Sequence, residues 1–139
     1  MSLGAPSRRE GRERALSLLY EAEAKDVSPP ALLEELPVDP PPFVTDLVAG
    51  VSRCQARIDE LIGRYAVDWS VDRMAVIDRN VLRLAVYELL ERPEVPKGAV
   101  ISEAVELAKR YSTDDSGRFV NGVLSSVAKE ARPPDRPST

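Results

Sequence analysis

The chain has 139 residues, which is enough for one domain with a hydrophobic core. Hydrophobic residues make up 43% of it and aromatic residues only 5%, a balance that favours helices over sheets. The net charge of −4 excludes a uniformly basic nucleic-acid-binding protein, so any such contact must come from a local patch or a partner. No histidine is present, which removes the commonest general acid–base and metal ligand and disfavours most enzyme classes.

The sequence also argues against a membrane protein and a disulfide-linked fold. No apolar run approaches the roughly 18 residues needed to span a bilayer, and the first ten residues lack the hydrophobic centre of a signal peptide. We therefore expect a cytoplasmic protein. The single cysteine, Cys54, cannot form an intramolecular disulfide, and we expect it to be a small buried residue on the apolar side of a helix.

The first half of the chain is predicted to form three helices. The residues from Ser7, a suitable N-cap, to about Lys25 carry apolar side chains at helical spacing. Residues 31–36 fit one short helix before the proline cluster at 37–42, which we expect to serve as a connector. Apolar residues then recur at steps of three and four over residues 44–65, which predicts one amphipathic helix of about 22 residues.

The second half is predicted to form three more helices. Residues 70–92 carry apolar side chains around much of the helix circumference, which is typical of a central helix. A fifth helix is marked by the apolar residues of 100–111. The sixth is capped by Asp114 or Asp115 and carries a regular apolar stripe to Ala131.

No segment alternates between apolar and polar residues for long enough to support a sheet. We therefore predict an all-α fold of about six to seven helices in two packed helical subbundles. The predicted domain covers residues 1–132, with subbundles at 7–66 and 70–131, and residues 133–139 are expected to form a disordered tail.

An arginine-rich segment at the start of the first helix is the first candidate for chemistry. Residues 8–14 contain four arginines, and on a helix Arg9, Arg12 and Tyr20 fall in one narrow sector while Arg14 points away. Arginine offers forked donors to phosphate and tyrosine a stacking face to an unpaired base, a combination that suits single-stranded RNA. A solvated helix end, partly neutralised by two neighbouring glutamates, is the alternative.

A second anomaly lies in the last predicted helix, where Asn121 and Gly122 occupy interior positions. Glycine there costs about 1 kcal/mol relative to alanine, which indicates a packing or functional requirement. Arg118 and Asn121 can donate hydrogen bonds to a ligand, whereas a tight helix crossing at Gly122 explains the glycine equally well. Phe119 alone is more typical of a core residue than of a stacking platform.

The carboxylates do not form a catalytic motif. None is placed with histidine or cysteine, and no glycine-rich phosphate loop follows a strand. Asp78 and Glu88 on the central helix are predicted to be salt-bridge or interface residues. We expect no catalytic residues, no metal site and no cofactor.

Four segments together resemble the NusB family. Residues 12–21 (RERALSLLYE) resemble its opening helix, and residues 78–89 (DRNVLRLAVYEL) resemble its central helix. Val95–Pro96, residues 101–109 (ISEAVELAK) and residues 119–124 (FVNGVL) follow in this order and are similar to the carboxyl half of the family. The resemblance covers about residues 8–130.

The resemblance implies a function and two partners. It implies an all-helical, non-enzymatic antitermination factor that pairs with NusE, which is also a small-subunit ribosomal protein, and binds the boxA element of nascent RNA. The complex is then expected to help RNA polymerase read through terminators, notably in ribosomal RNA operons.

The resemblance also assigns roles to individual residues. Asp115 resembles a carboxylate whose charge moderates RNA affinity, and Asp78 a position near the shared surface for RNA and NusE. Glu10 departs from members that carry another arginine there, which implies weaker RNA binding by the isolated protein and more dependence on the partner. The implied RNA-contacting positions, or positions near them, are Arg9, Arg12, Tyr20, Tyr65, Arg118, Phe119 and Asn121.

Two other interpretations stay open at this point. The first is an RNA-binding accessory domain of the kind fused to RNA cytosine methyltransferases, which is less favoured because this chain contains no methyltransferase domain. The second is a helical dimerisation module that binds only protein, since some NusB proteins form homodimers that could mask the arginine face. A metabolic enzyme is the least favoured class.

Overall fold

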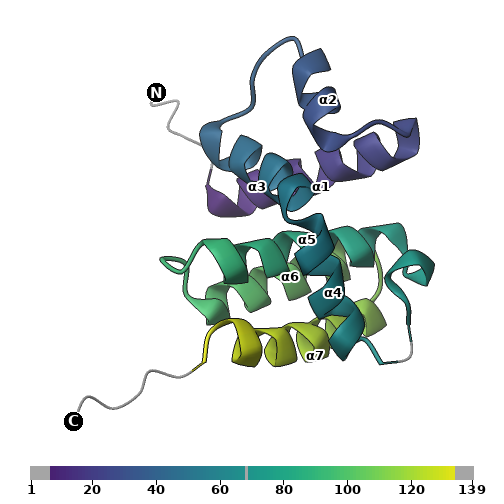
Figure 1. The fold of residues 1–139 in the computed structure, drawn as a ribbon, viewed down its shortest axis with the longest axis vertical. Coiled ribbons are helices and arrows are strands. Elements are labelled where there is room, and N and C mark those ends of the chain that lie inside the picture. The colour runs from purple at the N-terminus through teal and green to yellow at the C-terminus, as the bar shows by residue number, and fades with distance from the viewer. Residues whose placement is uncertain (1–6, 68, 134–139) are drawn as a thin grey trace.

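In a computed structural model, residues 7–67 and 69–133 are described, and this part of the chain contains helices and no strand (Figure 1). The predicted all-α class is confirmed. No helix in these two ranges is long and apolar enough to cross a membrane. The predicted disordered tail lies almost wholly outside the described residues.

The elements are α1 (Arg8–Lys25), α2 (Pro29–Glu35), α3 (Pro42–Arg53), α4 (Gln55–Tyr65), the 3₁₀ turn η1 (Val71–Arg73), α5 (Val76–Glu91), α6 (Lys97–Tyr111) and α7 (Asp114–Ala131).

Helix α1 begins and ends where the sequence predicts. The Ser7 hydroxyl accepts a hydrogen bond from the backbone N–H of Glu10 at 3.1 Å, so Ser7 is the N-cap. At the other end Asp26 adopts a left-handed conformation with φ of 55°, and its N–H bonds back to the last turn. The short second helix begins at Pro29, two residues earlier than predicted, because Ser28 caps it and proline fits the first helical position.

The single helix predicted over residues 44–65 is wrong, because the chain breaks at Cys54. This residue has φ of −101° and ψ of 9°, ends α3 and precedes α4. Apolar spacing continues across the break, so the periodicity alone could not reveal it. Cys54 is half-buried rather than fully buried, with its Sγ 3.9 Å from a carboxylate oxygen of Glu91.

Two further helix boundaries differ from the prediction. The central helix starts at Val76 instead of residue 70, since Val71–Arg73 form a separate 3₁₀ turn. The N-cap of α7 is Thr113, whose hydroxyl accepts from the backbone N–H of Ser116 at 3.0 Å. Asp114 and Asp115 therefore lie in the first turn, where their negative charges interact favourably with the positive end of the helix dipole.

The helices form two groups stacked along the long axis of the molecule (Figure 1). Helices α1, α2 and α3 pack on one another, while α4 packs against α5 and α7. The sequence predicted the boundary between the groups near residue 66, whereas this packing places it at Cys54. Helix α5 contacts both groups, through α1 and α3 on one side and through α4, α6 and α7 on the other.

The central position of α5 explains its composition. Ten of its residues are buried, among them Tyr87, which has no exposed surface. The Tyr87 hydroxyl donates to Asp46 of α3 at 2.8 Å, so its polar atom is satisfied at the junction of the groups. At the end of α5, where the backbone carbonyls run out of helical donors, the Arg132 guanidinium donates to the carbonyls of Glu88, Leu89 and Arg92.

Candidate nucleic-acid interface

Two arginines of α1 that share a predicted sector have opposite environments. The side chain of Arg9 is 57% exposed, whereas that of Arg12 is only 6% exposed. The Arg12 side chain is directed at α5, where it meets Glu88, whereas the Arg9 side chain reaches Glu103 of α6 at the surface. Arg14, which the sequence predicted to point away, is exposed.

Arg12 forms a buried ion pair with Glu88. Its Nε and one terminal nitrogen each donate to a different carboxylate oxygen at 2.8 Å, and its guanidinium lies 5.8 Å from the centre of the Phe43 ring. The prediction that Arg12 contacts RNA conflicts with this burial. Arg12 instead joins α1 to α5, and the prediction that Glu88 is a salt-bridge residue is confirmed.

Helices α1 and α6 are linked by exposed ion pairs in both directions. Arg9 of α1 donates two hydrogen bonds of 3.1 Å to Glu103 of α6, and Arg110 of α6 donates one of 2.6 Å to Glu13 of α1. The hydrogen bonds and charge of Glu103 raise the pKa of Arg9, and those of Arg9 lower the pKa of Glu103. Arg110 therefore pairs across helices and not within α6.

An apolar hollow lies between α1, α6 and the start of α5. Its volume is about 270 Å³. The rings of Tyr20 and Tyr111 are about half exposed, at 49% and 47%, and Leu16 and Ile77 line it between them. The Tyr111 hydroxyl donates to Glu13 at 3.3 Å, which ties this ring to the ion pairs above. We call this the tyrosine hollow.

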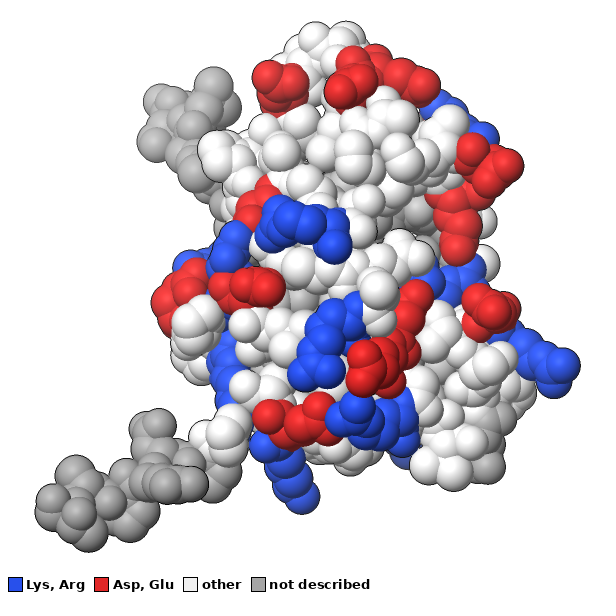
Figure 2. All heavy atoms as spheres, viewed as in Figure 1, with Lys and Arg blue, Asp and Glu red and all other residues white. Residues whose placement is uncertain are grey.

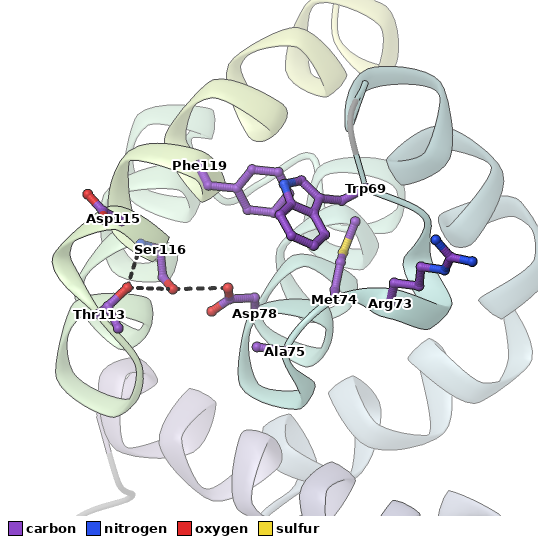
Figure 3. Close-up of a pocket in the computed structure, with 9 residues that line it drawn as sticks. All are labelled: Trp69, Arg73, Met74, Ala75, Asp78, Thr113, Asp115, Ser116 and Phe119. Carbon is purple, nitrogen blue, oxygen red and sulfur yellow. Dashed lines mark hydrogen bonds between the residues drawn. The ribbon is translucent and has the colours of Figure 1, made fainter.

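A second hollow, of about 260 Å³, lies between the start of α5 and the start of α7. Figure 3 shows the rings of Trp69 and Phe119 projecting into it from opposite sides, with Met74 below the Trp69 ring. Trp69 is 55% exposed, and Phe119 is half-buried against the core. We call this the tryptophan hollow. Its other lining residues are Arg73, Ala75, Asp78, Thr113, Asp115 and Ser116.

Asp78 brings an acceptor to the tryptophan hollow. One of its carboxylate oxygens accepts from the Ser116 hydroxyl at 2.9 Å (Figure 3). The other, Oδ1, is buried and has no hydrogen-bond partner among the described residues. An unsatisfied buried acceptor favours a ligand that can donate a hydrogen bond. Thr113 and Ser116 are hydrogen-bonded to each other at the N-cap of α7, so Ser116, the partner of Asp78, is fixed in place.

The predicted residues of α7 lie on its first two turns. Arg118 and Asn121 are exposed, and Arg118 pairs with Asp115 on the same helix. Gly122 is also exposed, and a Cβ added there would meet nothing within 4 Å. The tight helix crossing considered for Gly122 is therefore wrong.

Tyr65 lies apart from the other predicted residues. Its hydroxyl donates to Glu130 at 2.7 Å, a hydrogen bond that raises the pKa of Tyr65 and lowers that of Glu130. Glu130 is eleven residues beyond Phe119, which corresponds to about 16 Å along the axis of α7. Tyr65 thus contacts the far end of α7 from the tryptophan hollow.

Four of the predicted residues line the two hollows on either side of the start of α5. Tyr20 lines the tyrosine hollow, while Asp78, Asp115 and Phe119 line the tryptophan hollow. Trp69 and Tyr111 were not among the residues predicted for the site. Trp69 is the only tryptophan of the chain and lies between two helices beside polar residues. This unusual position was the signal in the sequence from which a functional role could have been inferred.

Charge and ligand chemistry do not point to another kind of site. On the face shown in Figure 2, basic and acidic side chains alternate over the lower helices, and acidic side chains gather towards α2. Over the described ranges, no group of three or more histidine, cysteine, aspartate or glutamate residues could hold a metal ion. The arrangement offers arginine, aromatic rings and one free acceptor, which are recognition groups.

Comparison with known proteins identifies relatives over nearly the whole chain. The model of the NusB family matches residues 9–129. A transcription antitermination protein NusB from Sorangium cellulosum is 44% identical over 136 residues, which cover 94% of this chain and 97% of the relative.

Solved structures agree with the sequence comparison. The structure of T. maritima NusB has a TM-score of 0.83 and 39% identity, covering 94% of this chain and 96% of that one. A chain in the structure of antitermination factors NusB and NusE with double-stranded RNA has a TM-score of 0.72 and 31% identity, covering 88% and 96% of the two chains. The chain described here belongs to the NusB family.

Proposed function

We propose that this chain is a transcription antitermination factor that binds boxA RNA together with NusE and promotes read-through by RNA polymerase, notably in ribosomal RNA operons. The observation that carries the proposal is the match over 88% of the chain to a structure of antitermination factors NusB and NusE in complex with double-stranded RNA. The protein acts in the cytoplasm as a binding partner and carries out no catalysis.

The proposed RNA surface runs along both hollows at the start of α5. Arg9 is exposed at one end and can reach phosphate, and Arg118 is exposed at the other. Between them, the rings of Tyr20 and Tyr111 and those of Trp69 and Phe119 offer stacking faces to unpaired bases. We assign Arg12 no direct contact, because it is buried on Glu88.

Asp78 gives the proposed surface a means of selecting bases. Asp78 lines the tryptophan hollow, and its buried Oδ1 has no partner in the described part of the chain. In the proposed complex, a base stacked there donates an N–H to the Asp78 carboxylate, and a base without a donor at that edge loses this hydrogen bond. Asp115, at the rim, places negative charge near the backbone of the RNA and moderates affinity.

A gel-shift titration with boxA RNA and a scrambled RNA, with and without NusE, tests the proposal. We expect the protein with NusE to bind boxA more tightly than the scrambled RNA. Trp69→Ala should weaken binding by about 1–3 kcal/mol, the worth of one stacked base. Val38→Ala, an exposed position on the connector, is the matched control and should change nothing. Equal binding of both RNAs would contradict the proposal.

The oligomeric state separates this function from a protein-only dimerisation module. We expect RNA and NusE to bind the monomer, so a homodimer, where one forms, should dissociate on adding boxA RNA and NusE. Size-exclusion chromatography with light scattering measures this directly. A homodimer that persists unchanged at saturating RNA and NusE would favour the dimerisation module.

A further inference from the structure

Arg9, an exposed arginine of α1, is already paired with a carboxylate. Arg9 donates through Nε and through one terminal nitrogen to the two carboxylate oxygens of Glu103, both at 3.1 Å. This parallel, two-bond geometry is the one that a guanidinium also offers to a phosphate group. A phosphate of bound RNA and the carboxylate of Glu103 therefore need the same face of Arg9.

The two partners of this pair differ in how firmly they are held. Arg9 lies in the first turn of α1 with a side chain that is 57% exposed, whereas that of Glu103 is 22% exposed. Glu103 projects from the second turn of α6, directly before the buried Ala104. Arg9 is thus the arm that can move, and Glu103 is the fixed acceptor.

The other charged residues near Arg9 and Glu103 do not take the place of either partner. Glu13 and Glu106 also act on Arg9 through their charge, but neither forms a hydrogen bond with it. Arg12 and Arg110 act on Glu103, yet each donates its own hydrogen bonds to another glutamate. Within the described residues, the contact of Glu103 with Arg9 is the one that occupies the exposed guanidinium.

We propose that Glu103 is an intramolecular competitor of RNA, whose carboxylate occupies Arg9 as a phosphate would and must be displaced when RNA binds. The inference rests on the proposed function and adds a regulatory residue to the same surface. Exposed ion pairs are weak, so Glu103 lowers RNA affinity without abolishing it. The effect applies to every polyanion, and it therefore makes binding depend more on base contacts and on the partner protein.

The substitution Glu103→Gln tests the proposal, because it keeps the size of the side chain and removes the competing charge. We expect boxA RNA to bind about two- to fivefold more tightly, in line with the strength of an exposed pair. The salt dependence should also steepen by up to about 0.7 in the slope of log K against log salt, as expected for one more phosphate contact on a single strand. Circular dichroism should show unchanged helicity.

Glu106→Gln is the matched control, since it removes the same charge one turn further along α6 from a residue that does not bond Arg9. The decisive measurement places both substitutions in an Arg9→Ala background. There, Glu103→Gln should lose its excess over Glu106→Gln, because no guanidinium remains to be released. Arg9→Lys, which keeps the charge, should retain part of the gain.

The outcomes separate this inference from the proposed function. If Glu103→Gln and Glu106→Gln tighten binding equally, with or without Arg9, the effect is one of net charge and the competition is wrong. If the native protein and Glu103→Gln both fail to bind boxA RNA even with NusE present, the proposed function is wrong and the competition falls with it. If Glu103→Gln binds boxA RNA without NusE and the native protein binds it only with NusE, the result would strongly support competition between Glu103 and RNA phosphate for Arg9.

Discussion

Helix α1 is joined to its neighbours in two different ways, and the two junctions use the same pair of residue types. Towards α5, Arg12 and Glu88 are buried and meet at 2.8 Å. Towards α6, Arg9 and Glu103 are exposed to different extents and meet at 3.1 Å. Arg9 and Arg12 are only three residues apart on the same helix.

The difference shows that burial, and not residue type, decides what an arginine does in this protein. A buried ion pair cannot be broken cheaply, since each charge left alone lacks both water and a partner. An exposed pair loses little when it opens, because water replaces the partner. The α5 junction is therefore suited to holding the two helix groups together, and the α6 junction to exchanging one anion for another.

The largest expected effect is at the buried junction. Glu88→Ala should lower the free energy of unfolding by about 3–5 kcal/mol, because Arg12 would remain buried without its partner. Urea unfolding followed by circular dichroism measures this. Replacing both residues, as Arg12→Met with Glu88→Leu, should recover most of the loss, since no charge is then stranded. A loss below about 1 kcal/mol for Glu88→Ala would mean that water reaches this pair.

A smaller effect is expected at the packing contact between α3 and α5. A Cβ added to Gly50 would overlap the Tyr87 ring, which is fixed by its hydrogen bond to Asp46. Gly50→Ala should therefore destabilise the protein by about 1–3 kcal/mol, as overpacking does, even though alanine is the better helix former. Thermal unfolding followed by circular dichroism checks the sign.

Gly63 offers the matched control for Gly50. It lies in α4, is exposed, and an added Cβ would meet nothing within 4 Å. Gly63→Ala should therefore stabilise the protein by roughly 0.5–1 kcal/mol through helix propensity alone. The same sign for both substitutions would show that the α3–α5 contact is less tight than the structure indicates.

Local sequence signals predicted the helices well but not how they meet. The apolar stripes and the Ser7 cap located α1 correctly, because these interactions lie within a few residues of one another. The break at Cys54 carries no proline or glycine and keeps the apolar spacing, so nothing local marks it. A salt bridge at Glu88 was predicted, but its partner Arg12 is 76 residues away and only the packing of α1 on α5 brings them together.

The candidate site was predicted in part for the same reason. Tyr20, Asp78 and Phe119 line the two hollows, although their binding roles stay predictions. Helical periodicity placed Arg9 and Arg12 in one sector, but it could not show that α5 covers only the second of them. Trp69 comes from the segment between two predicted helices, and Tyr111 was assigned only to the apolar pattern of the fifth predicted helix, whose last residue it is.

The smallest expected effect concerns the pH dependence of the exposed junction. The hydrogen bonds from Arg9 lower the pKa of Glu103 in the folded state below its usual value of 4.5, against the opposing effect of partial burial. A carboxylate with a lowered folded-state pKa stabilises the protein above its unfolded pKa, and this contribution is lost as the pH falls through the folded pKa. Glu103→Gln should therefore be slightly less stable than the native protein at pH 7, by no more than about 0.5 kcal/mol, and the difference should decrease as the pH is lowered towards 3. Urea unfolding at both pH values measures it, and because other carboxylates titrate in the same range, only the difference between the two proteins is informative. A difference of the same size at pH 3 as at pH 7 would show that Glu103 acts through packing and not through Arg9, which would also weaken its role as a competitor of phosphate.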